Sequence, residues 1–224
     1  MDQMYETNER QQPDNIVETP RVNVEILAKW IRVLFWISIA SVAAGGLTGD
    51  AMKELAPAVS IVGDIIIAAV SAVYAAVLFK IASEEEDYRK AAIFRIPGIV
   101  FSIAMVFLPD YEDNLGIAIG ALILSLLAMV LDLVSSYYEY GAHASVLARV
   151  DVVMSEKWER LWRWTIGMTV GMMVCLIFAV IAPFFGLLLL LAASVGMLVI
   201  GIMRLVYLFQ TGTAFRNYSN YMNQ

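Results

Sequence analysis

The sequence has almost none of the residues from which disulfides and metal centres are built. Its 224 residues include one cysteine, Cys175, and one histidine, His143. One thiol cannot form an intrachain disulfide, and it is too few for a zinc or iron–sulfur site based on cysteine. We therefore expect no disulfide framework, no metal site and no cofactor.

Charge is also scarce. Only 16% of the residues are charged, with 21 acidic against 15 basic residues, and 60% are hydrophobic. A soluble domain contains about a quarter charged residues, and a nucleic-acid-binding domain presents a basic patch. The composition therefore argues against a soluble globular protein, a disordered protein and a nucleic-acid-binding protein. It predicts an integral membrane protein whose first partner is the lipid bilayer.

Six apolar stretches are long enough, or nearly so, to cross a bilayer, which takes about 20 residues in a helix. The third is the shortest, and Pro183 predicts a tight turn between the last two. We predict an all-α polytopic protein with six transmembrane helices. The stretches are Trp30–Gly49, Pro57–Ala82, Ala91–Leu108, Leu115–Tyr138, Leu161–Ala182 and Phe184–Phe209.

The flanking segments are more polar. We predict that residues 1–21 form a disordered cytoplasmic tail and that the first helix after it is not cleaved. Residues 211–224 are predicted to form a cytoplasmic C-terminal tail. The transmembrane domain, 22–210, divides into hairpins at about 22–82, 83–138 and 155–209. Residues 139–154 have apolar residues at helical spacing, so they either extend the fourth helix or lie on the membrane surface.

The basic residues indicate the orientation. Every lysine and arginine except Lys53 falls in the tails, in the second and fourth loops, or in the adjoining helix ends. Because cytoplasmic loops carry an excess of Lys and Arg, both termini are predicted to be cytoplasmic. We expect the protein in the cytoplasmic membrane of a bacterial cell.

The three hairpins resemble one another. Arg32, Arg95 and Arg163 each lie beside an aromatic residue where an odd-numbered span begins, and candidate helix caps precede them at Asn23, Ser83 and Ser155. This recurrence indicates triplication of one hairpin. The alternative is that membrane hairpins share aromatic and basic inner ends in any case.

Apart from the basic residues near the span ends, three charged residues fall inside the predicted spans: Asp64, Asp132 and Arg204. Charged groups are costly in hydrocarbon and are often functional there. Asp132 and Arg204 lie at similar depth, which predicts an ion pair. Such a pair either locks the hairpins together or belongs to a site for a solute or an ion.

The arginines at the span entries suggest a second candidate site. Arg32, Arg95 and Arg163 could form a ring that binds an anion or a lipid headgroup. The alternative is that they only anchor the chain at the cytoplasmic boundary.

No catalytic constellation is present. Glu84, Glu85 and Arg89 resemble the first motif of the CAAX-protease-like intramembrane peptidases, but that family needs two further histidine-containing motifs, and His143 is the only histidine. We therefore predict a non-enzymatic protein, in the first place a structural or interaction component that meets a second copy or a partner subunit in the membrane.

A solute-binding or transport component is the alternative. In length and helix number the chain is similar to the S-components of energy-coupling-factor vitamin transporters. Those proteins also have an Ala-x-x-x-Ala pattern in the first helix, as at Ala40 and Ala44. The resemblance implies an intramembrane polar site for a solute.

Overall fold

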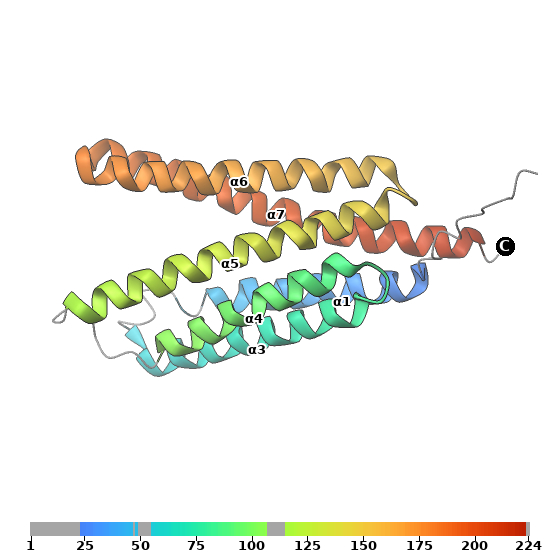
Figure 1. The fold of residues 1–224 in the computed structure, drawn as a ribbon, viewed down its shortest axis with the longest axis horizontal. Coiled ribbons are helices and arrows are strands. Elements are labelled where there is room, and N and C mark those ends of the chain that lie inside the picture. The colour runs from blue at the N-terminus through green and yellow to red at the C-terminus, as the bar shows by residue number, and fades with distance from the viewer. Residues whose placement is uncertain (1–22, 47, 49–54, 107–114, 223–224) are drawn as a thin grey trace, which may run out of the picture.

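The protein is all-helical. The computed structural model describes residues 23–46, 48, 55–106 and 115–222, so the N-terminal tail and Lys53 lie outside the described residues. Within these ranges there are six helices (Figure 1). They are α1 (Val24–Gly45), α3 (Pro57–Ile81), α4 (Glu86–Val106), α5 (Leu115–Leu147), α6 (Val152–Ile181) and α7 (Pro183–Met222).

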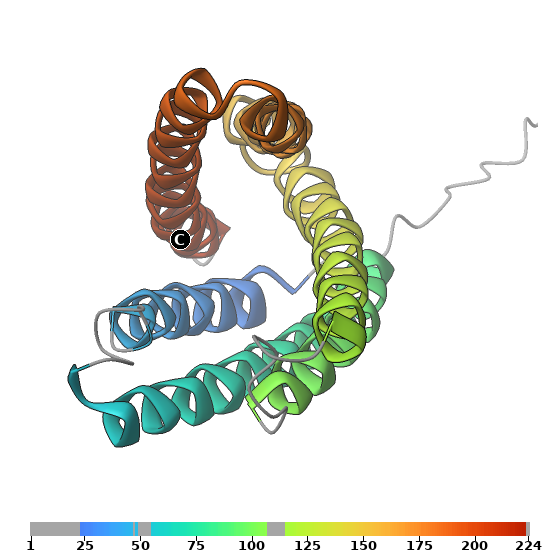
Figure 2. The same ribbon diagram turned by 90° about the vertical axis from the view of Figure 1, so that its left-hand side faces the viewer.

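The helices form a ring. Each helix packs against the next one in the chain, and α7 packs against α1, which closes the ring. Figure 2 shows the helices following one another around the bundle axis. α3–α4 and α5–α6 are joined at the end where α7 finishes, which we call the C-terminal end of the bundle (right in Figure 1). α6 and α7 are joined at the opposite end.

One of the three predicted helix caps is confirmed. The side chain of Asn23 accepts a hydrogen bond from the Ile26 amide at the start of α1. The Asn23 amide in turn donates to the Glu84 carboxylate, 2.6 Å away, in the α3–α4 turn. The cap therefore joins the first helix to the first hairpin turn at the C-terminal end.

The other two caps are wrong. The cap of α6 is Asp151, whose carboxylate accepts from the Met154 amide, because α5 ends at Leu147 and a short turn follows. Ser155 lies inside α6 and donates to the Ala144 carbonyl oxygen of α5. Ser83 donates to the neighbouring Glu84 side chain, and α4 starts only at Glu86.

Two helices run past their predicted ends. α5 continues without a break to Leu147, so residues 139–147 extend the fourth span and do not form a separate surface helix. Its 33 residues correspond to about 50 Å, against about 30 Å for the hydrocarbon layer. α7 continues to Met222, through most of the predicted C-terminal tail.

Four of the described helices are long and apolar enough to cross a membrane, namely α1, α3, α5 and α7. Large apolar side chains cover their outer surfaces, including Leu122, Leu187 and Leu198, which are about 60% exposed. Such surfaces suit contact with lipid. The structure therefore supports a membrane protein with several apolar spans, while six crossings, hairpin repetition and the position of the termini stay predictions.

The packed core lies toward the C-terminal end. Its largest fully buried side chains include Tyr88, Trp158 and Phe215, and it also contains the buried leucines and isoleucines of α1 and α3. Buried residues are fewer toward the opposite end, where Ala44, Ala121 and Ala193 are among them. The ring is thus filled at one end and less densely filled at the other.

The α6–α7 hairpin is held by a very close approach. Only Ala182 separates the two helices, and Pro183 begins α7, as the predicted turn requires. A Cβ atom added at Gly186 would overlap the backbone of Ala179 in α6, whereas one added at Gly167 would meet nothing within 4 Å. Glycine at position 186 is therefore what lets the two helices meet.

We predict that Gly186→Ala lowers the free energy of unfolding by about 1–3 kcal/mol, because the added methyl group forces the backbones of α6 and α7 apart. Gly167→Ala is the matched control and should be nearly neutral or slightly stabilising. Thermal unfolding of both variants in the same detergent measures the difference. Equal midpoints for the two variants would contradict the close approach.

Candidate functional site

The polar centre of the molecule is the carboxylate of Glu139, which is fully buried. Its Oε1 atom accepts from the Tyr74 hydroxyl at 2.6 Å and from Arg204 Nη2 at 2.7 Å, and its Oε2 atom accepts from Arg95 Nη2 at 3.2 Å. We call Tyr74, Arg95, Glu139 and Arg204 the Glu139 cluster. It joins four helices: α3, α4, α5 and α7.

The two arginines also pack on aromatic rings. The Arg95 guanidinium lies 4.5 Å from the centre of the Tyr74 ring, and the Arg204 guanidinium lies 5.5 Å from the same ring and 5.8 Å from that of Tyr140. Contact between a cation and a ring face is favourable, and more so away from water. The ring of Tyr74 therefore holds both cations close to one carboxylate.

The charges within the Glu139 cluster do not balance. Two guanidinium groups share one buried carboxylate, and the Nε atoms of Arg95 and Arg204 are buried without a hydrogen-bond partner. Excess buried charge is unfavourable unless a counter-charge approaches it. Taken alone the cluster carries one net positive charge, and the nearest further carboxylate is that of Asp132, 3.7 Å from Arg95.

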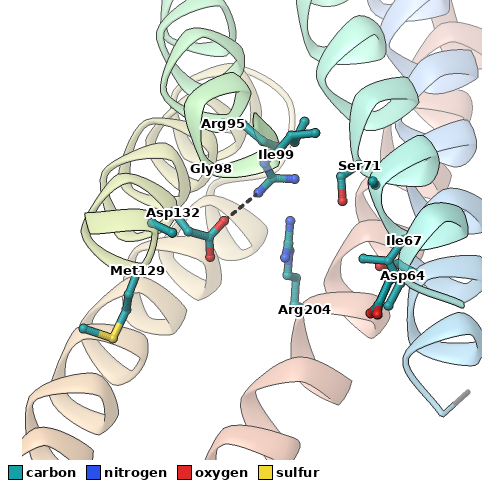
Figure 3. A pocket seen from close by; sticks show the side chains of 12 residues that line it. Asp64, Ile67, Ser71, Arg95, Gly98, Ile99, Met129, Asp132 and Arg204 are labelled. Carbon is teal, nitrogen blue, oxygen red and sulfur yellow. Dashed lines mark ion pairs between the residues drawn. The ribbon is translucent and has the colours of Figure 1, made fainter. Parts of the chain in front are cut away.

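A polar cavity of about 510 Å³ lies next to this cluster, within the size range of small-molecule sites. Arg95 and Arg204 line it, together with Asp64, Ser71 and Asp132 (Figure 3). A smaller recess of about 160 Å³ shares Ser41, Ser71 and both arginines with it. We call the larger space the central cavity.

The order of residues along α3 and α5 shows on which side of the Glu139 cluster the central cavity lies. On α5, the cavity residues Ala128 and Asp132 precede Glu139, and on α3 Asp64 and Ser71 precede Tyr74. Both helices run toward the C-terminal end (Figure 1). The cavity therefore lies on the side of the Glu139 cluster that faces the opposite end, and the two arginines form its floor.

The three charged residues predicted within the spans all line the central cavity. Asp132 and Arg204, however, have different partners. Asp132 Oδ1 lies 3.7 Å from Arg95 Nη2, whereas Arg204 binds Glu139. Glu139 lies two turns beyond Asp132 on the same face of α5, and it is the Glu139 carboxylate that lies within hydrogen-bond distance of Arg204. Asp64 faces the space from α3, on the other side of Arg204 (Figure 3).

The three arginines of the predicted ring have different surroundings. Arg95 enters the Glu139 cluster, while Arg32 is exposed on α1. Arg163 is exposed on α6, where it lines a separate cavity with Tyr137 and Trp162. The structure gives no contact that joins them at a common site.

Below the cluster, toward the C-terminal end, a second buried polar layer continues it. The Tyr88 hydroxyl lies 2.8 Å from Nδ1 of His143, and the His143 ring packs on Trp158 at an interplanar angle of 31°, with centroids 4.4 Å apart. Trp158 donates to the Thr211 hydroxyl of α7. Burial holds the pKa of the Tyr88 hydroxyl well above its ordinary value, and the charge of Glu139 adds to this effect. Tyr88 therefore remains a neutral hydroxyl at physiological pH.

Sequence reasoning missed Glu139, because the fourth span was predicted to end at Tyr138. A signal was present, since Asp132, Glu139 and His143 follow one another at seven- and four-residue spacing and so share one helix face. Extending the helical pattern past Tyr138 would have placed all three inside the bundle.

Comparison of the chain with protein-family models, curated proteins and solved structures found no match. Among the described residues, no group of three His, Cys, Asp or Glu side chains is arranged to hold a metal ion. The function must therefore be argued from the central cavity and its charges.

We predict that Glu139→Ala lowers the free energy of unfolding by about 3 kcal/mol, because it leaves two largely buried guanidinium groups without their shared carboxylate. Asp132→Ala is the matched control. Its side chain is 70% exposed and 3.7 Å from Arg95, so its loss should cost less than about 1 kcal/mol. Denaturant unfolding in mixed micelles measures both. Similar losses in the two variants would contradict the central role of Glu139.

Proposed function

We propose that this chain is a multi-pass membrane protein that binds a small solute with an anionic group in the central cavity, as a binding or transport component. The observation that carries the proposal is the pair of guanidinium groups, Arg95 and Arg204, that share one buried carboxylate at the floor of a polar cavity. A protein with a purely structural role would be expected to fill this space with apolar side chains.

The proposal takes all six helices as membrane-spanning. α4 and α6 occupy places in the same closed ring as the four apolar helices, and each packs along both of its neighbours. A chain that alternates direction at every helix places both termini on one side. The distribution of Lys and Arg supports the cytoplasm as that side, and the central cavity then faces away from it.

The two guanidinium groups at the floor of the cavity favour an anionic group on the solute. A carboxylate or phosphate can accept from a guanidinium group in a bidentate way, which gives both affinity and orientation. Asp132 is the present counter-charge of Arg95, but at 3.7 Å it makes no hydrogen bond and is largely exposed. A solute anion can therefore take its place without leaving a buried acid unpaired.

Asp64 adds a second recognition element. It stands on α3, near Ser71, and across the cavity from Asp132 (Figure 3). Its carboxylate would attract a cationic or hydrogen-bond-donating part of the solute. A small molecule with an acidic group and a donor group, such as an amino acid, matches this arrangement best.

The proposal is tested with a variant that fills the cavity and leaves the Glu139 cluster intact. Gly98 lines the cavity, and a Cβ added there meets nothing within 4 Å, so Gly98→Leu extends into open space. Gly167→Leu, on α6 and outside the cavity lining, is the matched control.

We predict that glutamate, succinate or inorganic phosphate raises the unfolding temperature of the purified protein, whereas the neutral analogue succinamide does not. An anion at 100 times its Kd stabilises the folded protein by about 2.7 kcal/mol. Gly98→Leu should abolish the response, and Gly167→Leu should retain it. If no anion stabilises the protein, or if Gly98→Leu responds like the unmodified chain, solute binding is wrong and the structural or interaction role is favoured.

A further inference from the structure

A second cavity lies between α5 and α6, apart from the central cavity. It measures about 380 Å³ and is lined by Tyr137, Tyr140, Gly141, Glu159, Trp162 and Arg163. None of these residues lines the central cavity. We call this space the α5–α6 cavity.

Three aromatic rings form its walls. The Trp162 ring lies 5.3 Å from that of Tyr137 and 6.4 Å from that of Tyr140, with interplanar angles of 60° and 77°. At such angles the rings do not stack as one layer, so the cavity is bordered by ring faces in more than one orientation. Aromatic walls of this kind attract organic cations, above all ammonium groups.

Two opposite charges complete the lining. Glu159 and Arg163 are both exposed and lie one turn apart on α6. Residues at this spacing commonly pair on a helix, yet among the described residues no ion pair joins them. The carboxylate thus stays available to an ammonium group and the guanidinium to a phosphate.

The position of the α5–α6 cavity along the helices identifies the source of such a ligand. Tyr137 lies where the apolar stretch of α5 ends, and Trp162 lies where that of α6 begins. If the helices cross the bilayer as proposed, both rings lie at the level of the lipid headgroups. The molecules always present at that level are phospholipids.

We infer that the α5–α6 cavity binds the headgroup of a zwitterionic phospholipid, with its ammonium group among the aromatic rings beside Glu159 and its phosphodiester on Arg163. Interfacial aromatic residues alone would make a belt without selectivity between headgroups. The α5–α6 cavity differs because it offers both charges next to the rings. The inference requires membrane insertion but does not require a solute in the central cavity.

Gly141 provides a direct test. It borders the α5–α6 cavity, and a Cβ added there meets nothing within 4 Å. Gly141→Leu therefore extends into the cavity without a clash at Cβ. Gly167→Leu is the control of equal size on α6. Glu159→Gln removes the charge that would attract the ammonium group, and Glu156→Gln, at another exposed glutamate of α6, is its control.

The experiment is native mass spectrometry of the full chain in detergent. Phosphatidylcholine, phosphatidylethanolamine and phosphatidylglycerol with the same acyl chains are added in turn. We predict that at least one of the two ammonium-bearing lipids binds about tenfold more tightly than phosphatidylglycerol. Gly141→Leu and Glu159→Gln should remove this preference, and the two control variants should keep it.

Equal binding of all three lipids to the unmodified chain would overturn the inference. An unchanged preference in Glu159→Gln would do so as well, and this variant stays informative even if Gly141→Leu fails to fold. The anion test on the central cavity uses different variants and different ligands. Failure of one proposal is therefore distinguishable from failure of the other.

Discussion

The bundle depends on one buried carboxylate. Glu139 accepts from α3, α4 and α7 at once, so hydrogen bonds to one buried side chain fix three helices relative to α5. Such bonds are strong because the surroundings are apolar, and for the same reason the loss of any partner is costly. The positions of Arg95 and Arg204, and hence the floor of the central cavity, follow from this single contact.

The two ends of the bundle are packed differently. At the C-terminal end large side chains such as Trp158, Tyr88 and Phe215 fill the ring completely. Beyond the Glu139 cluster the inward positions carry smaller or polar residues, among them Ser71, Gly98 and Ala128, and these leave the central cavity open. The well-packed half thus supports the two arginines at the floor of the central cavity, an arrangement that the proposed binding of a solute would require.

The sequence predicted more of the fold than of the site. Long apolar runs located all six helices, because the cost of exposing apolar residues operates over whole segments. Helix ends were less predictable. Ser83 and Ser155 look like caps in the sequence, yet α4 begins at Glu86 and α6 is capped by Asp151.

For the site, the apolar pattern identified Asp64, Asp132 and Arg204 as intramembrane charges that need a partner, and all three line the central cavity. Their actual partners depend on helix rotation and on how far α5 extends. The spacing of Asp132, Glu139 and His143 held a signal for Glu139, but the rotation of α4 that turns Arg95 inward is seen only in the packed structure.

Closure of the ring by α1 and α7 has a consequence for biosynthesis. Contact between the first and the last helix forms only after the ribosome has made nearly the whole chain. Until Arg204 is inserted, Glu139 can be paired with Arg95 alone. A truncated chain that lacks α7 therefore keeps an open ring, and its Glu139 carboxylate lacks the 2.7 Å contact with Arg204. Such incompletely packed chains expose surfaces that the complete chain buries.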